Sequence, residues 1–371
     1  MFISVASGLI GILFCFIIVI TIQILLNCRK RLSLPLVKFL LACCCFTGIR
    51  VFIPLEFSFT HTIESHYILP EFSKVLAKSI VGMKISYIAT TIWILVTFII
   101  AVIRIKSYIR LKKLLRYGRP VENSLVKEII ESTEKSTKRR IILKIISLNY
   151  ISEPFIFGIF HPIIVLPEKC IDNDKLGYII KHELGHYLHH DMWVKFLVEM
   201  LCVIQWWNPV VYILKRQMTN ILEFNNDLTI TDKISDKERI SYLECLIEVA
   251  EDKCNRNPRL SLGFYQLPKS LLKKRFLSVL DSGEIKTYKK YYILYLLFIT
   301  LFIASLSVVV EPVYITPDKM EESFEINSKN TYLQKVGEGY EIIVDNKVVG
   351  MVDTIPEGMK NFTIKGEENE R

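Results

Sequence analysis

Four long apolar stretches constrain the fold of this chain more than any other feature of its sequence. They run from about Phe2 to Leu26, Leu36 to Phe57, Ile85 to Ile103 and Tyr291 to Val310. Because about 20 apolar residues suffice to cross a bilayer as a helix, each stretch predicts a membrane span. The mean hydropathy of +0.33 agrees, since ordinary soluble chains are less apolar. The first stretch has no basic segment before it and no clear cleavage site, so we read it as a retained span.

Basic residues beside the apolar stretches predict the orientation of the chain. Lys and Arg gather in three segments, at Arg29–Arg31, 104–119 and Lys286–Lys290. Since cytoplasmic loops next to spans are enriched in these residues, all three segments are expected in the cytoplasm. Four spans then place both termini and the 58–84 loop outside. The net charge of +9 reflects this clustering beside the spans, and it does not indicate a nucleic-acid-binding protein.

The spans divide the chain into four predicted regions. These are three spans with short loops at 1–106, a domain at 107–290, a fourth span at 291–310 and an extracytoplasmic tail at 311–371. Only the second region is long enough to build a core of its own. In the tail, two apolar runs flank Asp345-Asn346-Lys347, which predicts a small β-hairpin of Tyr340–Val344 and Val348–Val352.

Within 107–290 the sequence predicts a mixture of helices and strands. A short amphipathic helix is expected at Ser124–Glu134, a β-branched run follows at Ile141–Leu148, and a hairpin pairs Pro154–Phe157 with Pro162–Leu166. Asp172–Asp174 offers capping residues for a helix from Gly177 to His190. Further helices are expected at 215–229 and 237–253, followed by a basic amphipathic stretch at 270–280.

The segment 193–214 leaves two interpretations open. It is strongly apolar, but Lys195, Glu199, Asn208 and Pro209 interrupt the run. One interpretation is a buried or interfacial helix pair, and the other is a re-entrant segment in the membrane. A full crossing would contradict the orientation that the basic residues predict.

The pattern His182-Glu183-Leu184-Gly185-His186 is the strongest chemical signal in the chain. On a helix, residues four apart share one face, so both imidazoles can bind one zinc ion. Glu183 then lies beside the open position of the metal, where a carboxylate can act as general base and acid on a bound water. The alternative is a surface helix with two solvated histidines. The nine cysteines include no C-x-x-C pair, so a thiolate zinc site is not indicated and reduced thiols are expected.

A catalytic zinc site needs a third protein ligand, and two candidates compete for that position. His189 and His190 follow His186 within one turn, although Met192 occupies the position of the third histidine in an H-E-x-x-H-x-x-G-x-x-H pattern. Glu223 is the other candidate, in an E-x-x-x-D pair with Asp227 on a separate predicted helix. Asp227 one turn later can hydrogen-bond a metal-bound imidazole. An acidic, solvated helix face is the alternative interpretation of this pair.

Four segments together resemble the BlaR/MecR-type antirepressor metallopeptidases, which are integral-membrane gluzincins. They are 152–167 (SEPFIFGIFHPIIVLP), 182–186 (HELGH) with Asp191 after it, 206–209 (WWNP) and 223–227 (EFNND). The resemblance covers roughly residues 1–310. It implies a mainly α-helical integral membrane protein with four transmembrane helices, and a cytosolic α+β gluzincin-type zinc protease domain between spans three and four.

The resemblance also implies roles for individual residues. His182, His186 and Glu223 would bind one Zn²⁺ per chain, and Glu183 would be the catalytic base. Asp227 would support the ligands, as would Asp191, for which a structural contact at a helix end is an equal alternative. Members of this family can bind a substrate strand along the edge of the hairpin sheet. The sequence does not select an oxyanion-stabilising residue.

The expected function is a zinc endopeptidase of the cell membrane that responds to an external signal and cleaves a cytosolic, repressor-like protein. Its partners would be that substrate and the lipid bilayer, without direct nucleic-acid binding. The sequence does not decide between a monomer and a homodimer. The tail has no S-x-x-K motif, so a penicillin-binding sensor domain and acylation by β-lactams are not expected. A quality-control or prenyl-protein zinc protease is one alternative. A receptor with a vestigial metal site is another.

Overall fold

In a computed structural model, the chain forms two compact units. The first comprises Met1–Thr62 and Ser86–Val310, and the second comprises Ile63–Ile85 and Glu311–Arg371. The structure describes residues 2–365 apart from 4, 29–31, 54, 58, 81–82, 150, 152, 169–174, 233, 255–268, 281–290, 313–329, 337–338, 346, 353, 356–358 and 360–361. Three predictions lie outside the described residues: the basic clusters Arg29–Arg31 and Lys286–Lys290, and the helix cap at Asp172–Asp174.

Three helices of the first unit are long and apolar enough to cross a membrane. They are α1 (Val5–Cys28), α2 (Leu34–Phe52) and α4 (Ile85–Leu115). The fourth predicted span corresponds to α11 (Tyr291–Ser307), a shorter apolar helix of 17 residues. The short strands β1 (Phe2–Ile3) and β2 (Leu55–Glu56) pair antiparallel, so the start of α1 and the end of α2 lie at the same end of the bundle. A mainly helical fold with apolar helices near the N-terminus is therefore confirmed.

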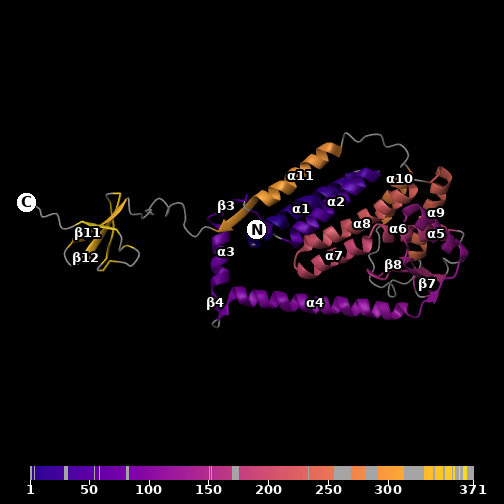
Figure 1. The fold of residues 1–371 in the computed structure, drawn as a ribbon, viewed down its shortest axis with the longest axis horizontal. Coiled ribbons are helices and arrows are strands. Elements are labelled where there is room, and N and C mark those ends of the chain that lie inside the picture. Colours follow the sequence, from indigo (N-terminus) through magenta and orange to yellow (C-terminus); the bar gives the residue numbers. More distant parts are fainter. Residues whose placement is uncertain are drawn as a thin grey trace, which may run out of the picture. The chain divides into compact units, whose positions relative to one another are not determined.

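Two further helices pack against α1 and α2. These are α7 (Asp191–Ile204) and α8 (Pro209–Thr231), which form a helical hairpin beside the apolar helices (Figure 1). One hydrophobic core joins all of them, with Ile22 of α1, Leu40 of α2 and Leu222 of α8 among its fully buried members. The peptidase-like segment and the first two apolar helices thus share a core.

The start of α8 differs from the sequence prediction of a helix from 215. The helix begins six residues earlier, at Pro209, and continues without a break through Lys215. Asn208 caps it, because its side-chain oxygen accepts a hydrogen bond from the backbone N–H of Val210 at 3.0 Å. Pro209 occupies the first helical turn, where its missing N–H costs nothing. Two of the residues that interrupt the apolar run, Asn208 and Pro209, therefore start a helix.

A four-stranded sheet lies ahead of the motif helix in the chain. Its order is β6 (Arg119–Pro120), β7 (Lys144–Leu148), β9 (Ile163–Pro167) and β8 (Phe155–Phe157). The predicted hairpin is confirmed, since β8 and β9 pair antiparallel, but the sequence did not reveal that β7 pairs parallel with β9. Gly158 enables the turn: its φ is 101°, and a Cβ there would lie 2.7 Å from the carbonyl oxygen of His161.

The helices α5 (Ser124–Thr137) and α6 (Leu176–Leu188) complete this part of the unit. Their apolar side chains form a core with the sheet, in which Ile164 and Leu166 of β9 are fully buried beside Ile180 of α6. The helices α9 (Asp236–Cys254) and α10 (Lys269–Leu280) follow α8, and α10 packs against both α8 and α9. Strand β10 (Val308–Pro312) follows α11.

The second unit contains the segment before α4 and the C-terminal tail. The segment before α4 has α3 (Ile68–Ala77), β4 (Ser79–Ile80) and β5 (Met83–Lys84), after β3 (His61–Ser65). In the tail, β12 (Gly339–Val344) and β13 (Lys347–Val352) form the predicted hairpin. The sequence missed two partners, because β11 (Thr331–Val336) and β14 (Thr363–Lys365) extend the hairpin to a four-stranded sheet.

Candidate metal centre

The motif helix α6 packs against the sheet and α5 on one face and against α8 on another. Leu176, Ile180 and Leu184 are spaced four apart and fully buried against the sheet and α5, so they fix the rotation of the helix. His182 and His186 lie on another face of α6, which packs against α8. The helical repeat therefore places both imidazoles between two helices.

Gly185 lets α6 and α8 approach closely. A Cβ at this position would lie 2.0 Å from the side-chain oxygen of Asn226, which is far inside van der Waals contact. The Asn226 amide nitrogen donates a hydrogen bond of 2.7 Å to the carbonyl oxygen of His182. The glycine inside H-E-L-G-H thus sets the separation of the helices that bear the candidate ligands.

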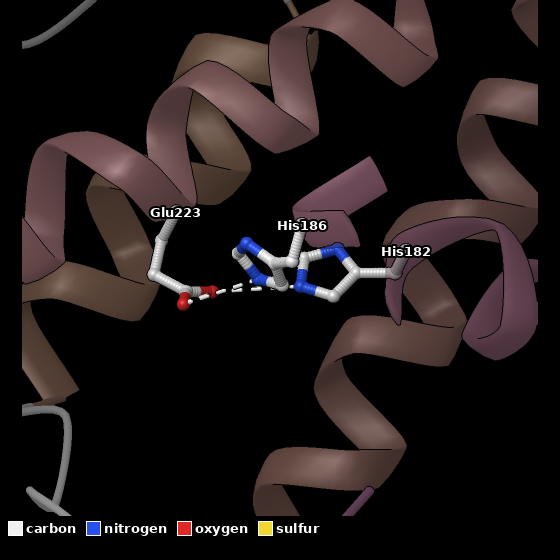
Figure 2. Close-up of side chains that lie close together, drawn as sticks. All are labelled: His182, His186 and Glu223. Carbon is white, nitrogen blue, oxygen red and sulfur yellow. Dashed lines mark ion pairs between the residues drawn. The ribbon is translucent and has the colours of Figure 1, made fainter. Parts of the chain in front are cut away.

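His182, His186 and Glu223 meet in the space between α6 and α8. One potential ligand atom of each residue lies within 4.8 Å of the others. Figure 2 shows both imidazoles facing the carboxylate: Nε2 of His182 is 3.5 Å from Oε2, and Nε2 of His186 is 3.4 Å from Oε1. A tetrahedral site with bonds of about 2.0–2.1 Å has donor atoms roughly 3.3 Å apart, so the observed distances fit one zinc ion.

The opposite nitrogen of His182 is held by a relay of two hydrogen bonds. Nδ1 of His182 lies 2.9 Å from the hydroxyl of Tyr242 on α9, and this hydroxyl donates to Oδ1 of Asp227 at 2.7 Å. A hydroxyl whose proton is engaged accepts from Nδ1–H, which leaves the lone pair of Nε2 free for a metal. Asp227 therefore acts on the imidazole through Tyr242, and its own oxygen is 3.5 Å from Nδ1.

His186 is held by a direct contact with a carboxylate. Its Nδ1 lies 2.6 Å from Oδ2 of Asp191, the first residue of α7, and both side chains are buried. Asp191 thus combines the helix-end position with a contact to the imidazole. Burial alone would lower the pKa of His186, but the carboxylates of Glu223 and Asp191 outweigh burial and raise it to about 9. The same negative charge favours a bound cation.

Arg275 of α10 supplies the positive charge that balances this acidic site. Its Nε and Nη2 donate to the two oxygens of Asp227 at 2.5 and 2.8 Å, and its Nη1 lies 3.3 Å from Oε2 of Glu223. Burial raises the pKa of Glu223, but the two imidazoles and Arg275 hold it well below its usual value. Glu223 is therefore an anion, the form that binds a metal.

The remaining predicted residues occupy different positions. Glu183 is buried beside His182, with 5% of its side chain exposed. His189 and His190 are not part of the ligand cluster among the residues that the structure describes. His189 ends α6, and His190 precedes α7 with a left-handed backbone (φ 59°). The structure thus brings Glu223 to the imidazole pair.

Sequence reasoning missed three supporting residues: Asn226, Tyr242 and Arg275. Asn226 lies inside the E-F-N-N-D segment, so its position could have drawn attention to it. Tyr242 and Arg275 lie 15 and 48 residues after Asp227, on separate helices, and no spacing connects them. The sequence predicts a basic amphipathic stretch at 270–280, but Arg275 within it is buried and only 5% exposed.

Comparison with known proteins identifies the family of this chain. The family model described as BlaR1 peptidase M56 matches residues 9–279, which include every helix of the candidate site. The chain belongs to the BlaR1 peptidase M56 family. The apolar helices and this match together indicate a membrane-associated protein of a metallopeptidase family, and a metal is implied.

Individual relatives within the BlaR1 peptidase family are distant. The chain is 26% identical over 253 residues to the methicillin resistance mecR1 protein of Staphylococcus aureus (strain Mu50), which is 66% of this chain and 41% of that protein. It is 21% identical over 194 residues to the regulatory protein BlaR1 of Bacillus licheniformis, covering 51% of this chain and 32% of the relative. This chain therefore spans about two fifths or less of the relatives' length.

Proposed function

We propose that this chain is a zinc endopeptidase of the cell membrane that cleaves a cytosolic regulatory protein. The observation that carries the proposal is the cluster of His182, His186 and Glu223, with both Nε2 atoms facing the carboxylate. Two imidazoles and one carboxylate are a donor set of catalytic zinc sites. The regulatory role is supported by relatives that carry the names of a regulatory protein and a resistance protein.

The residues around the cluster would divide the chemical work. Bound zinc would lower the pKa of a water molecule and polarise the peptide carbonyl. Glu183 would accept the proton of the attacking water and pass it to the leaving amine. Asp191 and the Tyr242–Asp227 pair would hold the two imidazoles with Nε2 toward the ion. Arg275 would keep Glu223 ionised.

The sheet beside α6 offers a place for the substrate backbone. β8 is the last strand in the sheet order, so one of its edges is not paired within the described sheet. Ile156 of β8 packs in the same core as Ile179 and Leu184 of the motif helix. An extended peptide added to this edge would run past α6, which favours cleavage within a chain over removal of terminal residues.

The proposed topology follows the distribution of basic residues. The described part of α4 continues from the apolar stretch into a basic end with Lys112 and Lys113, and such ends are typical of the cytoplasmic side. We propose four spans, with 107–290 as a cytoplasmic peptidase domain and both termini outside. A repressor-like protein would then be within reach of the metal centre.

The test separates chemistry from metal binding. The full chain is purified with zinc and incubated with unfolded casein, and products are identified by mass spectrometry. Glu183→Ala is expected to retain one zinc per chain and to lose about 10²–10⁴-fold in rate, the usual contribution of a general base. Glu131→Ala is the matched control, because Glu131 is an exposed acidic residue on α5. Glu183→Ala with unchanged cleavage would refute the proposed role of this glutamate.

The regulatory substrate is tested in cells. Proteins that persist in a strain with Glu183→Ala, and are cleaved in the strain with the unmodified chain, are compared by quantitative proteomics. One DNA-binding regulator among them supports the proposal. Accumulation of many unrelated membrane proteins would instead indicate quality control.

A further inference from the structure

The hairpin of α7 and α8 extends along the apolar helices to the end of the bundle that is remote from the metal centre. The amide nitrogen of Gln205, in the turn of the hairpin, donates a 3.1 Å hydrogen bond to the carbonyl oxygen of Val51. Val51 lies in the last turn of α2, at the end where β1 pairs with β2. We call this the far end of the bundle.

The metal centre lies at the opposite end. Lys274, next to Arg275, donates a 2.6 Å hydrogen bond to the carbonyl oxygen of Leu26 near the end of α1. Halfway along, Gln217 of α8 donates to the carbonyl oxygen of Val19 at 2.8 Å. From Pro209 to Glu223 the helix rises about 21 Å, so the turn lies that far from the candidate ligand along the bundle.

The turn pairs its amide side chains and two of its carbonyl groups within the protein, while the buried indole N–H of Trp206 has no partner among the described residues. Besides capping α8, Asn208 donates to the side-chain oxygen of Gln205 at 2.9 Å. The carbonyl oxygen of Trp206 accepts from the hydroxyl of Tyr212 at 3.1 Å, and that of Ile204 accepts from the indole of Trp93 at 3.0 Å. Such pairing is what a turn inside a bilayer requires, since no water is available there.

The outward faces of the hairpin are apolar. Six large side chains between 39% and 57% exposed lie along them: Trp193, Phe196, Leu197, Met200, Tyr212 and Ile213. No charged residue occurs in 200–214. Just outside this range, Glu199 binds both Lys215 and Arg104, the latter at 3.2 Å. The charges nearest the turn are therefore paired.

We infer that α7 and α8 form a re-entrant membrane hairpin whose exposed apolar faces contact lipid acyl chains. The hairpin enters from the end of the metal centre, turns at 205–208 and returns to the same end. The indole of Trp93 bonds the turn eight residues after the start of α4, so α4 continues about 12 Å beyond it. Because the hairpin returns to the end at which it enters, it adds no net crossing, which preserves the orientation predicted from the basic residues.

This placement has a consequence for the metal centre. Because α8 carries Glu223 about four turns from its buried start, one end of the ligand helix is anchored in the apolar core of the bundle. The cluster then lies near the inner boundary of the bilayer, level with the end of α1. The inference does not depend on catalysis, and it would hold for a chain without peptidase activity.

The tryptophans of this chain permit a direct test. All four of them, Trp93, Trp193, Trp206 and Trp207, lie on α4 or on the hairpin. The full chain is reconstituted in phosphatidylcholine vesicles with or without bromine atoms on the acyl chains, and quenching of emission is compared with quenching by aqueous iodide. A variant that keeps only Trp207, which is 52% exposed, reports on the turn. Tyr117→Trp in a background without other tryptophans is the water-exposed control, since Tyr117 is 84% exposed.

Brominated lipid is expected to reduce the Trp207 emission about twofold or more, with little effect of iodide, because the residue contacts the hydrocarbon. The control is expected to respond to iodide alone. Quenching of Trp207 by iodide and not by lipid would overturn the inference, because the turn would lie in water. Protection from both quenchers would also overturn it, because another protein surface would cover the hairpin. If the variant does not fold, quenching of the total tryptophan emission of the unmodified chain by brominated lipid and by iodide distinguishes the same outcomes.

Discussion

Replacing Gly185 by alanine tests whether the contact between α6 and α8 sets the metal centre. The added Cβ would lie 2.0 Å from the side-chain oxygen and 2.9 Å from Cγ of Asn226. Asn226 is fully buried, so it has no open space to move into. Either the two helices separate by more than 1 Å, judged against an ordinary contact of about 3.5–4.0 Å, or the amide turns away.

Both responses cost more than the alanine gains as a helix former. Alanine in a helix is favoured over glycine by about 1 kcal/mol. Overpacking a tight contact costs about 1–3 kcal/mol. Turning the Asn226 amide breaks its bond to the carbonyl oxygen of His182, and an unpaired buried amide costs about 1–3 kcal/mol. Subtracting the gain from the cost, we expect Gly185→Ala to lower the free energy of unfolding by up to about 2 kcal/mol.

Metal affinity is the more specific measurement. His182 and His186 lie on α6 and Glu223 lies on α8, so separating the helices lengthens the 3.4 and 3.5 Å distances between them. We expect the zinc affinity of purified chain, measured by competition with a chromophoric chelator, to fall at least about tenfold. Gly177→Ala on the same helix is the matched control. A Cβ there meets only side-chain methyl groups at 3.6 and 3.7 Å, so this change should leave zinc affinity intact.

A second variant decides whether the steric contact is the cause. Asn226→Ala removes the atoms that meet the new Cβ, so zinc affinity of the double variant should exceed that of Gly185→Ala alone. Independent, additive losses from the two substitutions would refute the steric explanation. Equal zinc affinity of Gly185→Ala and the unmodified chain would show that the helix separation does not control the ligands.

The residues that support the candidate ligands give three further predictions. Asp191→Asn should weaken zinc binding about 10–100-fold without loss of fold, because His186 loses a charged acceptor; circular dichroism and a zinc titration check this. Tyr242→Phe removes the hydroxyl between His182 and Asp227, so zinc affinity should fall while the thermal midpoint changes little. Arg275→Met should destabilise the chain by about 3–5 kcal/mol, because Asp227 stays buried without a counter-charge. Arg275→Lys should restore part of that loss, since a lysine supplies the charge but not both hydrogen bonds.

The parts of the site that follow a helical repeat could be predicted from the sequence. His182 and His186 are four apart, and Glu223 and Asp227 are four apart, so each pair was expected on one helix face. The hairpin of β8 and β9 was also visible, because apolar runs flank a glycine and a proline. These patterns are local in the sequence, so they can be recognised without knowledge of the tertiary fold.

Contacts between distant segments could not be predicted in the same way. The parallel pairing of β7 with β9 and the addition of β11 and β14 to the tail hairpin depend on which strands meet in space. Tyr242 and Arg275 look like ordinary members of polar helices, and only their burial beside Asp227 distinguishes them. Propensity and periodicity carry no information about which distant segments come into contact.

The E-x-x-x-D pair shows why one spacing can serve two purposes. Both carboxylates project toward Arg275, yet Glu223 faces the imidazole nitrogens while Asp227 faces Tyr242 and is fully buried. An unpaired buried carboxylate would be protonated or would destabilise the fold. Arg275 prevents both outcomes by binding Asp227 in a bidentate manner and keeping Glu223 anionic. Lys274 of α10 also donates a hydrogen bond to the end of α1. A shift of α1 would therefore move the neighbouring Arg275, whose charge keeps Glu223 ionised.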